Sequence, residues 1–196
     1  RSDCGSKSDW SNATNFTTSC SNILDAPYSN SFENFPTIPN IEQEDCWTAN
    51  SNGDFKWSVA EGALSIQTGP SSAFDGSKYF VTDASQGVLG DEAYLTSPTL
   101  DINSLSNTVL SFSSFMFGEN MGELKVEVDN LFGGGYQEVL SLSGEEQANQ
   151  NELWSQHAID LSAFFNTVKV RFTATRGDGN SSNIAIDNFK IDGCVV

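Results

Sequence analysis

The sequence predicts an all-β protein, an antiparallel β-sandwich of jelly-roll type. Helical periodicity is nearly absent, and short alternating or β-branched segments recur between clusters of Gly, Asn, Asp and Ser. Short strands at this spacing are typical of two packed sheets. In chain order the strands are expected at 63–69, 78–83, 93–100, 108–117, 123–129, 137–144, 167–176 and 183–191.

The length and charge of the chain limit its partners. A chain of 196 residues is long enough to bury a substantial core. Its formal net charge is −17, from 9 basic and 26 acidic residues. Nucleic acid and anionic membranes are therefore poor partners, because phosphate groups bind Lys and Arg. No apolar segment approaches the roughly 18 residues of a membrane span.

The four cysteines are far apart and include no Cys-x-x-Cys pair. This spacing argues against zinc and favours two disulfides in an exported, secreted protein, with three possible connectivities. The residues concerned are Cys4, Cys20, Cys46 and Cys194.

Two acidic residues are expected in apolar surroundings. Alternation in SNIAIDNFKIDGC places Asp187 on one strand face with Phe189 and Ile191, and Glu33 shares a face with Phe35 in SFENF. Such a carboxylate is costly to bury unless it is paired, hydrogen-bonded or bound to a metal. The two acids therefore suggest a common partner.

The acidic residues of KVEVDNLF are the strongest candidates for catalytic groups in the sequence. Glu127 and Asp129 share a strand face, as in the Glu-x-Asp-x-x-Glu motif of jelly-roll glycoside hydrolases. Phe132 stands where the acid/base Glu would be, so leaving-group protonation would fail. The single histidine, His157, has no triad partner in the sequence. We therefore expect a protein that is not an enzyme.

From Cys20 onward the chain resembles a MAM domain, the extracellular β-sandwich module named from meprin, a neuropilin and a receptor phosphatase. Six motifs carry the resemblance in order: FENF, CW followed by Asp54 and Trp57, TGPSSAFDGSKYFVTDAS, AYLTSPTLD, GELKVEV with the later Trp154, and IAIDNFKIDGC. The sequence resembles a bacterial version of the module. Residues 20–196 are thus expected to form one domain.

Residues 1–19 are expected to be a separate unit. Phe16, Thr17 and Thr18 resemble the end of the last hairpin of a fibronectin type III-like module. The alternative is a linker.

The resemblance also implies a disulfide pattern and a metal. Cys20 and Cys46 look like the first pair of the family, and Cys194 then pairs elsewhere, with Cys4 as the candidate, because Val109 or Leu110 replaces the partner in the middle strand. Similar sandwiches often carry a structural calcium ion near the first and last strands. Calcium binds six to eight oxygen atoms. The candidate ligands are Glu33, Asp75, Asp187 and Asn188.

The function expected by analogy is that of a non-catalytic carbohydrate-binding module in a secreted multidomain polysaccharide-degrading enzyme. The ligand would be an algal galactan such as agar or porphyran, bound on aromatic platforms with a few planar polar groups. The alternative is a protein interaction, adhesion or spacer module of a secreted peptidase. The candidate ligand-binding residues are Tyr136, Phe132, Tyr94, Arg176 and Lys78, the last two as cations for a sulfated glycan.

Overall fold

The computed structural model describes residues 20, 23–37, 43–44 and 46–195 of the chain. The expected fibronectin-like tail or linker at 1–19, including Cys4, lies outside the described residues. Within the described part of the chain, no helix is long and apolar enough to cross a membrane.

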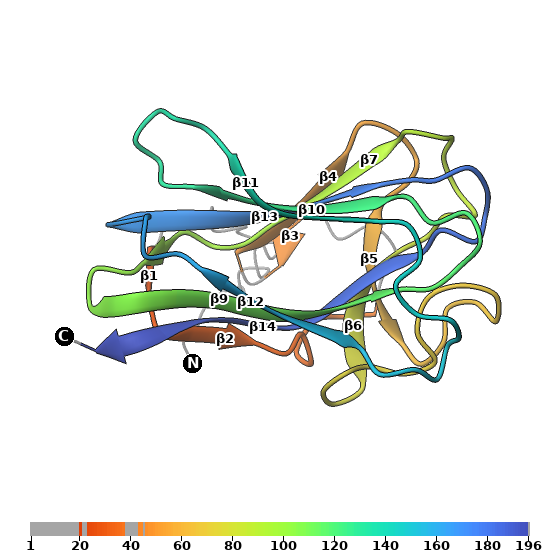
Figure 1. Ribbon diagram of the computed structural model, residues 1–196, viewed down its shortest axis with the longest axis horizontal. Helices are drawn as coiled ribbons and strands as arrows, with labels where there is room; N and C mark the ends of the chain where they lie inside the picture. The colour runs from red at the N-terminus through yellow and green to blue at the C-terminus, as the bar shows by residue number, and fades with distance from the viewer. Residues whose placement is uncertain (1–19, 21–22, 38–42, 45, 196) are drawn as a thin grey trace, which may run out of the picture.

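Two stacked β-sheets form the molecule, which confirms the expected all-β sandwich (Figure 1). The larger sheet has eight strands: β1 (Leu24–Asp25), β3 (Gln43–Glu44), β4 (Trp47–Ser51), β7 (Glu92–Thr96), β8 (Leu100–Asp101), β10 (Glu123–Asp129), β11 (Gln137–Ser143) and β13 (Thr167–Thr175). The smaller sheet has six strands: β2 (Tyr28–Asn30), β5 (Trp57–Glu61), β6 (Lys78–Thr82), β9 (Leu105–Met116), β12 (Ser155–Asp160) and β14 (Ile184–Val195).

Each sheet is organised around one long strand. In the eight-stranded sheet, β13 pairs with β10 along one edge and with both β7 and β8 along the other. In the six-stranded sheet, β14 pairs with β9 along one edge and with β6 and β2 along the other. The β1–β8 pair is parallel, and these other pairs are antiparallel.

The main core lies between the two sheets. It contains a group of fully buried aromatic side chains, several of which contact one another edge to face. Their burial removes the largest apolar surfaces of the chain from water, which is the dominant favourable contribution to folding. The group includes Phe32, Phe35, Trp47, Phe80, Phe172 and Phe189.

The six-stranded sheet is also covered on its outer face. A second cluster there contains Tyr79, Val81, Phe115 and Ala185, against which the half-buried Trp154 packs. The eight-stranded sheet differs, because burial alternates along β10 and along β13 as far as Phe172. Its outer face therefore carries the polar half of each strand at the surface.

A β-bulge in β14 determines which residues of this strand face the main core and which, like Asp187, face outward. Between Asp187 and Lys190 the chain advances three residues while its partner β9 advances two, and Asn188 has a φ of 53°. The extra residue reverses the alternation, so that Ile186 and Phe189 both face the main core. The expectation that Asp187 shares a face with Phe189 is therefore wrong: it lies on the outer face, beside Ala185.

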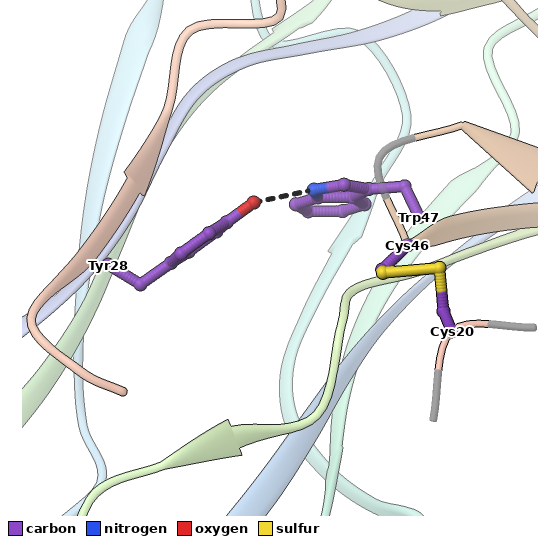
Figure 2. The surroundings of a disulfide bond; sticks show 4 residues. All are labelled: Cys20, Tyr28, Cys46 and Trp47. Carbon is purple, nitrogen blue, oxygen red and sulfur yellow. Dashed lines mark hydrogen bonds between the residues drawn. A yellow bond between two sulfur atoms is a disulfide. The ribbon is translucent and has the colours of Figure 1, made fainter. Parts of the chain in front are cut away.

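One disulfide joins the start of the described chain to the beginning of β4 (Figure 2). Cys20 is bonded to Cys46, as the resemblance implied. The next residue, Trp47, donates a hydrogen bond from its indole Nε1 to the hydroxyl of Tyr28 at 3.1 Å. Cys194 is an exposed thiol with no disulfide partner in the described part of the chain, and its predicted pairing with Cys4 stays a prediction.

Most predicted strands are present, but one is not. Segment 63–69 forms bends and turns rather than a strand, with Gly62 and Gly69 both at a φ of 74°. Its apolar residues are exposed, Leu64 by 45% and Ile66 by 87%, so alternation here does not reflect burial in a sheet.

Candidate functional site

On the outer face of the eight-stranded sheet, an arginine, a glutamate and two tyrosines from different strands and connections lie together. Strand register places Arg171 of β13 beside Glu127 of β10 and Thr96 of β7. Thr173, two residues further along β13, lies beside Tyr94 in the next row. Together with Tyr136 from the β10–β11 connection, these side chains form what we call the tyrosine–arginine face. It comprises Tyr94, Thr96, Glu127, Tyr136, Arg171 and Thr173.

Arg171 is held by Glu127 in a two-pronged ion pair. The guanidinium donates from Nε to Oε2 at 2.9 Å and from Nη2 to Oε1 at 2.8 Å. The hydroxyl of Thr173 donates to the same carboxylate at 2.6 Å. The side chains of Arg171 and Glu127 are 27% and 16% exposed, so the pair is partly shielded from solvent. These contacts fix the plane of the guanidinium.

Two tyrosine rings contact that guanidinium. The ring centroid of Tyr136 lies 3.8 Å from Cζ of Arg171, and the centroid of Tyr94 lies 5.5 Å from it. The Tyr94 hydroxyl donates to Oε2 of Glu92 at 2.5 Å. Both rings are half-buried, which leaves part of each accessible to solvent.

The pKa values of this group follow from the same contacts. Burial alone would raise the pKa of Glu127, but the hydrogen bonds and charge of Arg171, with the hydroxyl of Thr173, hold it below its usual value. The hydrogen bond to Glu92, followed by burial, raises the pKa of Tyr94. Burial is the main reason that the pKa of Tyr136 is raised. Near neutral pH the face therefore presents an ion pair between two neutral phenols.

This arrangement is suited to binding rather than to acid–base chemistry. A carboxylate whose pKa is lowered by an arginine is a weak proton donor at neutral pH. In the described part of the chain, Nη1 of Arg171 donates no hydrogen bond, so its N–H groups are available to a ligand. His157 is half-buried, stacks on Phe112 and hydrogen-bonds to Ser114 Oγ at 2.8 Å.

The other predicted ligand-binding residues lie apart from this group. Phe132 is 63% exposed and stacks on Phe165 of the β12–β13 connection, with centroids 5.7 Å apart. The Nζ of Lys78 donates to the backbone carbonyls of Glu33 at 3.0 Å and Phe35 at 2.8 Å, so its ammonium already has protein partners.

The expectation that Arg176 is an exposed cation is wrong. Its side chain is 7% exposed. Nε and Nη2 both donate to the carbonyl of Ala84, at 3.0 and 2.8 Å, and further donors reach Gly177 and Asn180. Arg176 therefore holds neighbouring connections together.

The predicted calcium ligands surround one short segment, residues 74–78. Oδ2 of Asp187 accepts from the backbone amides of Phe74 at 2.8 Å and Asp75 at 3.0 Å, and its Oδ1 accepts from the amide of Asn188 at 2.6 Å. Asp187 is fully buried, and burial raises its pKa to about 6. The backbone amides thus supply the partner that a buried carboxylate requires.

Glu33 is bound by the same segment from the other end. Its Oε1 accepts from the amides of Ser77 at 2.9 Å and Lys78 at 2.7 Å. Glu33 is only half-buried, contrary to the expectation that it shares an inward face with Phe35. Among the described residues, no three acidic, histidine or cysteine side chains gather as a metal-binding group. The arrangement therefore does not by itself fit a calcium shell, and calcium binding stays a prediction.

The family of the chain is shown by a match over most of its length. The family model "MAM domain, meprin/A5/mu" matches residues 40–195. The chain belongs to the MAM family. The module expected from Cys20 onward is thereby confirmed over that range.

Solved structures with the same fold come from several kinds of protein. The MAM domain resembles the K2 cleaved adhesin domain of Lys-gingipain, with a TM-score of 0.58 and 17% identity over 85% of this chain and 98% of that one. It also resembles TmCBM61 in complex with β-1,4-galactotriose, with a TM-score of 0.51 and 12% identity over 78% and 92% of the two chains. A Stig cyclase from Fischerella sp. TAU has a TM-score of 0.51 and 15% identity over 84% and 94%. At these identities the likeness shows the fold.

Sequence reasoning missed Arg171 as the centre of this MAM domain's polar sheet face. The alternation in TVKVRFTATR was the available signal, because it places Lys169, Arg171 and Thr173 on the polar side of one strand. Its neighbours Tyr94 and Glu127 come from strands far away in sequence, so only the strand order brings them together.

Proposed function

We propose that this MAM domain is a non-catalytic carbohydrate-binding module, and that the tyrosine–arginine face binds the glycan. The observation that carries the proposal is the fixed guanidinium of Arg171 between Tyr94 and Tyr136 on an uncovered sheet face. Figure 1 shows the β10–β11 connection, which carries Tyr136, rising from this sheet away from the six-stranded sheet.

The chemistry of the face suits a sugar. A pyranose ring has apolar C–H faces that pack on aromatic rings and hydroxyl groups that pair with planar polar side chains. The face offers two half-buried phenol rings and an arginine with unused N–H donors. Its contacts are already formed without ligand, so little conformational entropy would be lost on binding.

The charges nearby favour a neutral polymer. Arg176 and Lys78, predicted as cations for the ligand, are bound to backbone carbonyls instead. The strands around Arg171 carry the acidic residues Glu92, Glu123, Glu127, Asp129 and Glu138 and the basic residues Lys125 and Lys169, so acidic side chains outnumber basic ones there. A sulfated chain would be repelled by these carboxylates. Of the two algal galactans considered, agar therefore fits the face better than porphyran. The shared fold with a module solved in complex with β-1,4-galactotriose supports a carbohydrate-binding module.

The proposal also includes the cellular location of the protein and the kind of longer protein to which the domain belongs. A disulfide between Cys20 and Cys46 persists in oxidising compartments, which supports a secreted protein. A binding module of this kind would serve an attached polysaccharide-degrading domain by holding it on its substrate. Calcium, if bound near Asp187, would act on the stability of the fold.

The alternative function is protein contact or adhesion. It is favoured by a separate surface feature, the exposed pair Phe132 and Phe165 with the neighbouring Leu131, and by the likeness to the gingipain adhesin domain. Neither residue of this pair belongs to the tyrosine–arginine face.

Affinity electrophoresis against agar, porphyran, carrageenan, alginate, laminarin and mannan tests the proposal. We expect agar to retard the wild-type domain and the Tyr94→Ala variant to migrate freely. A domain that no glycan retards, but that forms dimers or binds the neighbouring domains of its parent chain, would support the alternative instead.

A further inference from the structure

A groove of about 390 Å³ opens on the other side of the sandwich. It lies between the connection that follows β5 and the connection that precedes β12. Its lining includes the rings of Trp154 and Phe74, the side chain of Leu153 and the amides of Gln150, Asn151 and Gln156.

The aromatic wall of this groove is held in place. The indole of Trp154 packs edge-on against Tyr79 and Phe115, with centroids 5.7 and 5.4 Å apart. Its Nε1 donates to the carbonyl of Ser72 at 3.2 Å. Because Tyr79 and Phe115 belong to the outer cluster of the six-stranded sheet, the groove lies on the face opposite the tyrosine–arginine face.

Hydrogen bonds also join the two connections that form the groove. The amide of Ser71 donates to the carbonyl of Gln150 at 3.1 Å. The side-chain amide of Gln150 donates back to the carbonyls of Gly69, at 3.3 Å, and Ser65. The shape of the groove is therefore set before any ligand enters.

The remaining groups of the groove are free to meet a ligand. Leu153 is 90% exposed and Phe74 36% exposed. The side-chain amides of Asn151 and Gln156 form no hydrogen bond with the part of the chain that the structure describes. Each amide carries both donors and an acceptor, a combination that matches neighbouring sugar hydroxyls.

The groove is nearly uncharged in a strongly acidic chain. Glu152 is its one ionisable lining residue, and its carboxylate already accepts from the amide of Ala148. By contrast, the groove beside β5 is lined by Asp54, Lys56, Glu61 and Asp83. With a net charge of −17 over the whole chain, an aromatic groove with a single carboxylate and no basic lining residue suits a neutral hydroxylated ligand.

We propose that this groove is a second glycan-binding site, specific for neutral hexose units, and that the domain is bivalent. The inference rests on the proposed function, because both sites would bind the same neutral galactan. Two sites on opposite faces engage separate polymer chains or separate stretches of one chain. The second contact then raises the apparent affinity for a polymer without changing the affinity of either site for a short oligosaccharide.

An NMR titration of the ¹⁵N-labelled domain with an agarose hexasaccharide separates the two sites. We expect shifts in the backbone amides of Leu153 and Gln156 and, independently, in those of Tyr94 and Tyr136. Shifts confined to Tyr94 and Tyr136 would overturn the second site and leave the proposed function intact. Shifts confined to the groove would overturn the tyrosine–arginine face instead. A spectrum unchanged by the sugar would overturn both.

Variants at exposed positions give a second measurement without damage to the core. The double variant Leu153→Ala, Gln156→Ala should bind agarose polymer at least tenfold more weakly while its hexasaccharide affinity at the tyrosine–arginine face is unchanged. Val88→Ala, at another exposed apolar position, is the matched control and should behave as wild type. Equal polymer affinity in wild type and double variant would contradict bivalent binding.

Discussion

The ring of Tyr136 lies over the guanidinium of Arg171, with its centroid 3.8 Å from Cζ. The two residues are far apart in the sequence, and the pairing of β10 with β13 brings them together. Tyr136 comes from a glycine-rich connection in which Gly133 and Gly135 have φ values of 90° and 68°. This backbone lets the connection fold back so that the tyrosine reaches the sheet. The contact joins a loop residue to a rigid strand residue.

Replacing Tyr136 tests the aromatic part of the face. Tyr136→Ala removes a half-buried ring from Arg171, and we expect agar binding to weaken about tenfold, equivalent to about 1.4 kcal/mol. Isothermal titration with an agarose hexasaccharide measures this change. Phe132→Ala is the matched control, because Phe132 lies in the same connection as Tyr136 but stacks on Phe165 rather than on Arg171, so this variant should leave binding within a factor of two. A reversed pattern would assign the platform to Phe132.

Replacing Arg171 tests the fixed guanidinium. Arg171→Lys keeps the positive charge but cannot form the two-pronged pair with Glu127, so we expect a loss of about 1–2 kcal/mol in the free energy of unfolding and loss of glycan binding. Urea unfolding and affinity electrophoresis measure the two effects. Lys125→Ala is the control, because the Lys125–Glu123 pair is more exposed and should leave stability unchanged. Full binding by Arg171→Lys would exclude a geometric role for the guanidinium.

The burial of Arg176 gives a prediction about stability alone. Arg176→Ala leaves the carbonyl of Ala84 without its two donors, and we expect the free energy of unfolding to fall by about 2–4 kcal/mol. Glycan binding by the folded fraction should be unchanged. Thermal melting followed by circular dichroism measures the first effect, and a stable variant that has lost binding would return Arg176 to the ligand site.

The buried carboxylate of Asp187 predicts a pH dependence. Its folded-state pKa of about 6 lies above the unfolded value of 3.8, so its contribution to stability is fully present below about pH 4 and is lost as pH rises through 6. This difference amounts to about 3 kcal/mol at neutral pH. In EDTA, Asp187→Asn should therefore destabilise the protein less at pH 7 than at pH 4. Urea unfolding of both proteins at the two pH values gives the comparison, and a pH-independent difference would contradict it.

The calcium prediction requires its own measurement. An ion bound by Glu33 and Asp187 would stabilise the folded state according to its concentration and dissociation constant. If the ion binds there, the melting temperature falls when EDTA replaces millimolar calcium, and magnesium restores it less than calcium does. Equal melting curves in EDTA and calcium would show that hydrogen-bond donors of the protein, among them the backbone amides of 74–78 and Asn188, satisfy the two acids without an ion.

The strand pattern could be read from sequence where one sheet face is polar. β10 and β13 alternate clearly, and both lie within the expected ranges 123–129 and 167–176. The short strands β1, β3 and β8 have two residues each, too few for any period to be visible. The alternation at 63–69 is misleading, because this segment forms bends and its apolar residues Leu64 and Ile66 are exposed rather than packed in a sheet.

The candidate site could be predicted only in part. The sequence predicts Tyr94 and Tyr136 as exposed loop residues. Tyr94 lies in β7 instead, and the structure brings both half-buried rings to one cation. That cation is Arg171 rather than Arg176, because a neighbouring connection supplies carbonyls that bury Arg176. Local sequence carries no information about which distant carbonyl or carboxylate an arginine meets.

The extra residue in β14 has a consequence for how the length of this chain can vary. Loss of Asn188 would restore regular pairing with β9 and keep Phe189 on the core side, but it would remove the backbone amide that donates to Oδ1 of the buried Asp187. The spacing between Asp187 and Phe189 should therefore stay fixed among relatives even where the residue between them changes.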